Sequence, residues 1–164
     1  QLAVTYAKVH AEEYGIPADK FKNTDLHIHA PEGAVPKDGP SAGVTLTTAL
    51  VSALSGIPVR GDVAMTGEIS LLGRVMPIGG LKEKSMAAYR EQKRLVIIPK
   101  ENEPDLKEFD EAVLNNVEFL PVSHISEVLA AALFREEKKA AEDVIAAGTW
   151  CVPATAPQPA SAAL

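Results

Sequence analysis

The spacing of hydrophobic residues divides this chain into alternating helices and strands. Residues 1–14 place apolar side chains three to four positions apart, as one face of a helix requires, and residues 25–30 alternate polar and apolar residues, as a half-buried strand does. Residues 41–55 are small or aliphatic with no charged side chain, so we expect a helix that is buried on all sides. The proline- and glycine-rich residues 31–40 predict a loop before it.

The second half of the chain continues this alternation with shorter elements. The expected strands are two short ones within residues 63–76 and single ones at 95–99 and 117–122, and the expected helices are at 81–92 and 104–115. A last helix should begin at a cap formed by Ser123, with Glu127 near the capping-box position. Elements in this order predict an α/β (α+β) domain with mixed short sheets and packed helices.

Composition fits one globular domain and excludes several classes of protein. The chain has 164 residues, 46% of them hydrophobic and 23% charged, which is enough to form a core. Its net charge of −6 argues against a dedicated nucleic-acid surface, which would be basic. No apolar run approaches the roughly 20 residues that span a bilayer, and no signal peptide is visible. Cys151 is the single cysteine, so no intrachain disulfide can form, and we expect a reducing compartment such as the cytoplasm.

The two ends of the chain differ in character. It begins with Gln1 rather than methionine, and we interpret it as part of a longer protein. Residues 148–164 are rich in alanine and proline and have no hydrophobic period, so we expect a flexible tail there. The folded domain is therefore predicted to occupy residues 1–147.

A first candidate for chemistry is Ser41, which stands where the glycine-rich loop meets the apolar helix. Backbone N–H groups at a helix start lack intrahelical partners and the helix dipole is positive there, so an oxyanion beside Ser41 could be stabilised. Alternatively, Ser41 only caps the helix. Gly39 to Gly43 also fits G-x-S-x-G, but that nucleophile elbow needs a preceding strand and a later acid and histidine. A proline-rich loop precedes Ser41, and His124 is the only later histidine.

A second candidate is the lysine-bearing helix that follows Gly79 and Gly80. If residues 81–92 are helical, one face carries Leu81, Lys84, Ser85 and Ala88. Lys84 then either extends to solvent or is buried as a neutral amine among small and apolar side chains. A neutral amine near a serine can accept its proton, as in serine–lysine variants of the catalytic triad. The ordinary interpretation is a solvated surface lysine.

Other polar residues allow weaker hypotheses. His27 and His29 would face one side of the expected strand and could bind a metal with Glu32 or Asp38. Zinc sites need three or four ligands and no second cluster appears, so we expect no metal site and a structural role for the histidines. Thr66 could hydrogen-bond a neighbouring amine, or it is an ordinary strand residue. The phosphate-binding pattern G-x-x-x-x-G-K-[ST] does not occur in the chain.

Taken together, four ordered segments resemble the proteolytic domain of the Lon protease family. Residues 25–34 resemble the strand and loop before its nucleophile, and residues 36–43 its active-serine signature in the bacterial and organellar form. Residues 62–69 and 79–84 resemble its lysine-bearing half. The similarity runs from residue 1 to about residue 134, and four motifs in one order make it specific.

The resemblance implies an ATP-dependent serine endopeptidase that hydrolyses peptide bonds of unfolded or damaged proteins. Ser41 would attack the carbonyl carbon and form an acyl-enzyme. Lys84, rather than Lys82, would accept the serine proton and return it to the leaving amine, and Thr66 would orient the Lys84 amine. The supporting positions that it implies around the nucleophile and the oxyanion are Asp38, Gly39, Pro40, Ala42 and His29. The implied fold is a compact Lon-type domain similar to the ribosomal small-subunit-protein-like fold.

The resemblance also implies partners that this chain does not contain. The family forms homo-hexameric rings in which an AAA+ ATPase domain of the same chain binds ATP and magnesium and unfolds the substrate. No cofactor is expected in the proteolytic domain itself. The family's domain normally begins upstream with strands that are missing before the first helix here. As an alternative, Lon-like domains of DNA-repair ATPases are non-proteolytic assembly modules without the serine–lysine pair, and the presence of both residues favours the enzyme.

Overall fold

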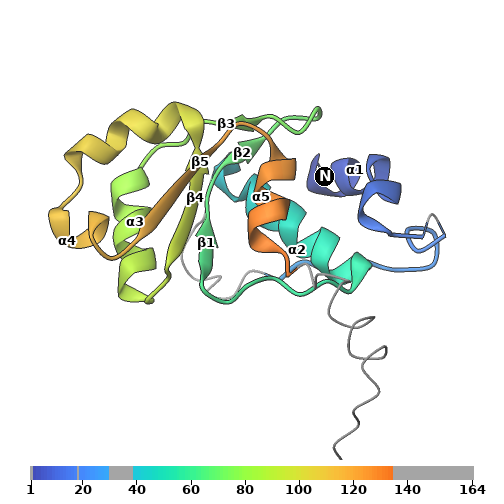
Figure 1. Ribbon diagram of the computed structural model, residues 1–164. Coiled ribbons are helices and arrows are strands. Elements are labelled where there is room, and N and C mark those ends of the chain that lie inside the picture. Colours follow the sequence, from blue (N-terminus) through green and yellow to red (C-terminus); the bar gives the residue numbers. More distant parts are fainter. Residues whose placement is uncertain (1, 18, 30–38, 135–164) are drawn as a thin grey trace, which may run out of the picture.

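The computed structural model describes residues 2–17, 19–29 and 39–134, and it confirms the predicted α/β class (Figure 1). The α-helices are α1 (Leu2–Val9), α2 (Gly43–Ser55), α3 (Leu81–Arg90), α4 (Glu111–Leu114) and α5 (Ile125–Ala132). The 3-10 helices are η1 (Glu12–Tyr14), η2 (Pro40–Ala42) and η3 (Lys100–Glu108). The strands are β1 (Val63–Met65), β2 (Glu68–Ile69), β3 (Val75–Met76), β4 (Leu95–Pro99) and β5 (Glu118–Val122). None of the described helices has the length and apolar character that crossing a membrane requires.

Strand β4 is the centre of a parallel sheet with the order β1-β4-β5. All five of its residues are buried, because helices cover both faces of the sheet. Leu95 and Ile97 point into a first core that β4 shares with α1, α2 and α5. Val96 and Ile98 point into a second core, which they share with α3 and α4. Figure 1 shows these two helix groups on opposite sides of the sheet.

Helix α2 fills much of the first core, as its apolar sequence predicts, but it is not buried on all sides. Thr45, Ala49 and Ala53 form an exposed stripe, so this part of the prediction was wrong. Two threonines are nevertheless fully buried. The hydroxyl of Thr47 donates to the Gly43 carbonyl oxygen at 2.9 Å, and that of Thr48 to the Val44 oxygen at 2.8 Å. These bonds to the preceding turn satisfy the hydroxyls without a tertiary partner.

The strand expected at residues 25–30 is not formed. Residues 25–29 carry no regular secondary structure, and Ala30 lies outside the described residues. An alternating pattern indicates side-chain direction only, whereas a strand also needs a hydrogen-bonded neighbour. No strand within the described residues pairs with this segment.

Helix boundaries in the second half of the chain also differ from expectation. In place of one helix over 104–115, η3 ends at Glu108 and α4 begins at Glu111. The break places Phe109 in the second core, where its ring meets that of Phe119 edge-on at a centroid distance of 5.6 Å. The N-cap of α5 is His124 rather than Ser123, because the His124 ring accepts from the Ser126 N–H.

The start of α2 closely approaches β2 at Gly43. The Val44 N–H donates to the Gly67 carbonyl oxygen at 3.1 Å, and the Gly67 N–H donates to the Ser41 carbonyl oxygen at 2.9 Å. A Cβ atom on Gly43 would lie 2.7 Å from Ile69 Cγ2 and 2.8 Å from the Ile69 nitrogen. Only glycine allows this approach.

Substituting Gly43→Ala should therefore destabilise the fold. The added methyl group meets the backbone of Ile69, which cannot move aside as a side-chain tip can, and overpacking of this kind costs about 1–3 kcal/mol. Gly61→Ala is the matched control, because a Cβ there meets no atom within 4 Å, and it should leave stability unchanged or raise it by up to about 1 kcal/mol. Urea denaturation followed by circular dichroism measures both, and equal midpoints would contradict the packing argument.

Candidate active site

Ser41 lies in the middle of η2, the short 3-10 helix that leads directly into α2. It is not the N-cap of α2, since that position is taken by Ala42, so the capping alternative is wrong. The Ser41 carbonyl oxygen accepts two hydrogen bonds, from the Gly67 N–H at 2.9 Å and from the Thr66 hydroxyl at 3.4 Å. Among the described residues the Ser41 hydroxyl has no hydrogen-bond partner. The backbone of the serine is thus fixed while its hydroxyl is left available.

Ser41 and Lys84 line the same cavity, which has a volume of about 250 Å³. Gly39, Pro40 and Ser41 form one wall. The loop of residues 77–79 and Lys84 form the other wall. The tertiary structure therefore brings together the two candidates that the sequence places on separate elements.

Lys84 is exposed rather than part of the buried stripe of α3. Leu81, Ser85 and Ala88 are buried, as their spacing predicts, whereas Lys84 takes the first of its two alternatives and extends to solvent, so the buried alternative is wrong. The Lys84 amine extends over the N-terminal end of the helix and donates to the Gly79 carbonyl oxygen at 2.6 Å. A hydrogen bond between Lys84 and the Ser41 hydroxyl is not formed in this structure.

A left-handed turn at Gly80 makes this contact of Lys84 possible. Gly80 is the N-cap of α3 and has φ 67°, a conformation that favours glycine. A Cβ atom at this position would lie 4.0 Å from Lys84 Nζ and 3.3 Å from a carboxylate oxygen of Glu83. A Cβ atom would thus meet the lysine amine only at an ordinary contact distance, and it is the left-handed turn that favours glycine here.

Thr66 is buried next to Ser41, and its hydroxyl donates to the Ser41 carbonyl oxygen rather than to the Lys84 amine. The acceptor for that amine is Gly79 instead. A supporting role for Thr66 stays a prediction, but the structure connects it to the nucleophile and not to the base. The sequence alone does not indicate which group the hydroxyl of a threonine directly after β1 will bond.

The other predicted supporting positions are distributed over different places. Gly39 and Pro40 line the cavity of Ser41 and Lys84, whereas Asp38 lies outside the described residues. His29 lines a separate cavity together with His27 on the exposed side of α2. Within the parts of the chain that the structure describes, no three His, Cys, Asp or Glu side chains gather as metal ligands would.

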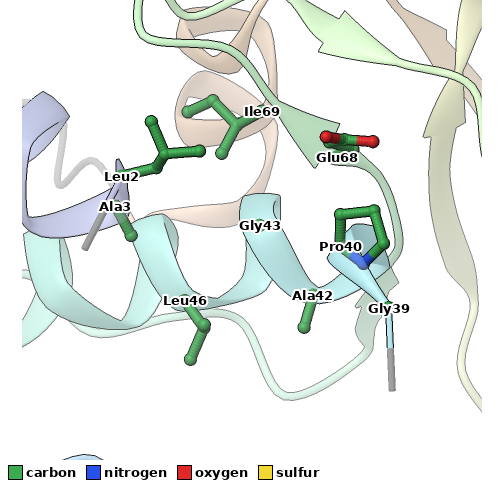
Figure 2. Close-up of a pocket in the computed structure, with 9 residues that line it drawn as sticks. All are labelled: Leu2, Ala3, Gly39, Pro40, Ala42, Gly43, Leu46, Glu68 and Ile69. Atoms are coloured by element: carbon green, nitrogen blue, oxygen red, sulfur yellow. The ribbon is translucent and has the colours of Figure 1, made fainter. Parts of the chain in front are cut away.

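A second, apolar cavity of about 270 Å³ adjoins the first, and sequence patterns did not predict it (Figure 2). Gly39 and Pro40 line both cavities. Figure 2 shows that its walls come from α1, from η2 with the start of α2, and from β2. The lining residues are Leu2, Ala3, Gly39, Pro40, Ala42, Gly43, Leu46, Glu68 and Ile69. Such a site cannot be found from spacing, because its residues are neighbours only after folding.

Asn102 is a further residue near this site that the sequence patterns did not indicate. It is buried in η3, and its side chain holds the backbone of Ile78, one of the residues that line the cavity of Ser41 and Lys84. An asparagine within a polar segment rich in acidic residues carries no signal of such a role.

Comparison with known proteins agrees with these observations. The model of the Lon protease (S16) C-terminal proteolytic domain matches residues 1–135. A Lon protease of Chloroflexus aggregans is 57% identical over 135 residues, which are 82% of this chain and 16% of that protein. A Lon protease of Brevibacillus choshinensis is 54% identical over 136 residues, covering 83% of this chain and 18% of the relative.

A third relative extends the match further along the chain. The Lon protease of Nitratidesulfovibrio vulgaris is 51% identical over 153 residues, covering 93% of this chain and 18% of that protein. The chain thus spans less than a fifth of the length of these curated relatives. With the family model matching most of its length, this chain belongs to the Lon protease (S16) family, in the region of the C-terminal proteolytic domain.

Proposed function

We propose that this domain hydrolyses peptide bonds as the proteolytic part of an ATP-dependent Lon-type protease, with Ser41 as nucleophile and Lys84 as general base. The observation that carries the proposal is the cavity that Ser41 and Lys84 line together. A serine hydroxyl with no other partner among the described residues and a lysine amine at the same cavity are the two groups that a serine–lysine pair needs.

The proposed reaction has two stages. The Ser41 oxygen bonds to the peptide carbonyl carbon while its proton passes to the Lys84 amine, which then donates that proton to the leaving amine as the peptide C–N bond breaks. Water next attacks the acyl-enzyme, Lys84 accepts a proton from the water, and that proton returns to Ser41 as the ester breaks. The Ser41 N–H has no partner within η2, and it is a candidate donor to the oxyanion.

The apolar cavity beside Ser41 supports a preference for substrates with a hydrophobic side chain near the cleaved bond. It opens next to the nucleophile, and its walls are mostly aliphatic and small residues. Burial of an apolar side chain there would fix the peptide relative to the Ser41 hydroxyl. Unfolded proteins expose such side chains, which agrees with the proposed substrate class.

The partners and surroundings of the domain belong to the same proposal. The relatives are several times longer than this chain and are named as proteases. We propose that an AAA+ ATPase domain of the same chain binds ATP and magnesium and delivers unfolded protein, in a homo-hexamer of the cytoplasm. The serine–lysine reaction needs no metal or cofactor of its own. Nothing supports the non-proteolytic assembly module, since both reactive residues face one cavity.

The test of the proposal is a set of three variants in the complete protein that carries this sequence. Ser41→Ala should abolish peptidase activity and covalent labelling by a fluorophosphonate, and Lys84→Met should reduce both by at least about a hundredfold. Lys82→Met is the matched control, because Lys82 is an exposed lysine on the same helix whose amine bonds the Glu108 carbonyl oxygen instead. Melting curves check that each variant is folded. Activity that survives Ser41→Ala, or that is lost equally in Lys82→Met, would refute these roles.

Thr66→Val is expected to slow peptide hydrolysis without unfolding the domain. The change removes the hydroxyl that donates to the Ser41 carbonyl oxygen, a contribution of about 0.5–1.5 kcal/mol, which corresponds to roughly two- to tenfold in rate. Thr45→Val is the control, since the Thr45 hydroxyl donates to the Met65 carbonyl oxygen at a similar 3.3 Å but lies on the exposed side of α2. Steady-state kinetics on a fluorogenic peptide compare the two, and equal rates would show that Thr66 has only a packing role.

A further inference from the structure

The side chain of Asn102 holds both backbone polar groups of Ile78. Asn102 Oδ1 accepts from the Ile78 N–H at 2.9 Å, and Asn102 Nδ2 donates to the Ile78 carbonyl oxygen at 3.0 Å. Asn102 is 6% exposed, so water competes little for these bonds. Among the described residues Ile78 has no other hydrogen-bond partner. One carboxamide therefore replaces the neighbouring strand that this backbone segment lacks.

Asp105 fixes the orientation of this carboxamide. Asn102 Nδ2 donates its second hydrogen to Asp105 Oδ2 at 2.8 Å. An ionised carboxylate only accepts, so the nitrogen and not the oxygen of the amide must face Asp105. Both amide hydrogens and the amide oxygen are then used, and a flipped amide would lose these bonds. The Asn102 carboxamide is thus held in the one orientation that binds both polar backbone groups of Ile78.

The segment that Asn102 holds is a wall of the proposed active site. Pro77, Ile78 and Gly79 line the same cavity as Ser41. The Gly79 carbonyl oxygen, next in the chain after Ile78, is the acceptor of the Lys84 amine at 2.6 Å. Asn102 itself does not line the cavity, so it has no direct contact with a substrate there. A displacement of Ile78 would move the Gly79 carbonyl, to which the lysine amine is hydrogen-bonded.

We infer that Asn102, oriented by Asp105, is a positioning residue for catalysis. It places the loop of residues 77–79, and through the Gly79 carbonyl it places the Lys84 amine relative to Ser41. The inference rests on the proposed function, because it assigns to Asn102 an effect on the general base. A misplacement of a catalytic group by about 1 Å can cost as much as a hundredfold in rate, so the effect should appear in kcat more than in stability.

The experiment compares variants of the complete protein by kcat and KM on a short fluorogenic peptide that needs no unfolding. Asn102→Ala removes both bonds to Ile78. Asn102→Asp keeps the shape and an acceptor for the Ile78 N–H, but it sets a carboxylate oxygen against the Ile78 carbonyl and Asp105. Both variants should lower kcat roughly tenfold or more with KM within about threefold, and Ser41 labelling by a fluorophosphonate should slow in parallel.

Two further variants separate positioning from general stability. Asp105→Asn still offers an amide oxygen to Asn102 Nδ2, so kcat should stay within about threefold of wild type. Val113→Ala removes buried side-chain volume from the second core, against which Ile78 also packs, but it leaves both hydrogen bonds to the Ile78 backbone in place, and it serves as the destabilised control. Its melting temperature should fall by as much as that of Asn102→Ala, while kcat stays within about twofold of wild type.

A double variant, Asn102→Asp with Asp105→Asn, identifies the bond that matters. It restores a hydrogen bond between the two side chains but returns no donor to the Ile78 carbonyl oxygen. Recovery of kcat in the double variant would show that the pair acts only as local structure, and it would overturn the inference. Loss of kcat equal to that of Asn102→Asp supports it.

If Asn102→Ala does not fold, Asp105→Ala replaces it in the comparison with Val113→Ala. In Asp105→Ala the carboxamide loses the group that orients it, while its bonds to Ile78 remain possible.

Hydrogen exchange gives a readout that does not depend on activity. Amides of residues 76–80 should exchange faster in Asn102→Ala than in Val113→Ala at equal stability. If the wild type is active in a Ser41-dependent way but Asn102→Ala matches Val113→Ala in kcat, the inference about Asn102 is wrong and the proposed function stands. If activity survives Ser41→Ala, the proposed function is wrong, and the exchange data alone then decide whether Asn102 holds the loop.

Discussion

Two backbone hydrogen bonds at Gly67 connect the serine-bearing part of the chain to the rest of the domain. The Gly67 N–H donates to the Ser41 carbonyl oxygen, and the Gly67 carbonyl oxygen accepts from the Val44 N–H. These bonds join η2 and the start of α2 to the segment between β1 and β2. They close only because Gly43 carries no side chain where it meets Ile69. The position of the nucleophile is thus set by backbone contacts, which depend little on side-chain rotation.

The central strand β4 explains why the serine and the lysine come from opposite sides of the sheet. Its alternating side chains enter two cores, one beneath α2 and one beneath α3. Ser41 leads into α2 and Lys84 lies on α3, so their separation depends on how the two layers are joined at the end of the sheet. The loop of residues 77–79 crosses this junction and lines the shared cavity. Among the described residues, the side chains of Asn102 in η3 and Lys84 in α3 hydrogen-bond its backbone, and Ile78 also packs against the second core.

The exposed position of Lys84 has a consequence for the proposed chemistry. An amine in open contact with water is a poor general base, since proton transfer in an active site depends on a controlled environment. A substrate chain in the two adjoining cavities would cover the amine and exclude water from it. One N–H of the Lys84 amine then stays hydrogen-bonded to the Gly79 carbonyl oxygen. The rest of the amine group remains available to Ser41.

The sequence by itself determined the fold class, most helices and strands, the family, and the two residues now found at one cavity. Periodicity and turn residues report local structure, and the four ordered motifs report the family, so both can be interpreted without coordinates. The boundary at residue 147 and the tail after it lie outside the described residues and stay predictions, as does the role of Asp38.

Only the tertiary structure decided what surrounds each of these residues. Helical spacing placed Lys84 on a buried face, but the left-handed turn at Gly80 and the carbonyl of Gly79 take its amine to solvent. Thr66 was expected beside the lysine and lies beside the serine. Asn102 had no sequence signal, because its partner Ile78 is distant in the chain and is recognised through its backbone. Backbone groups are the same in every residue, so contacts made to them leave no pattern in the sequence.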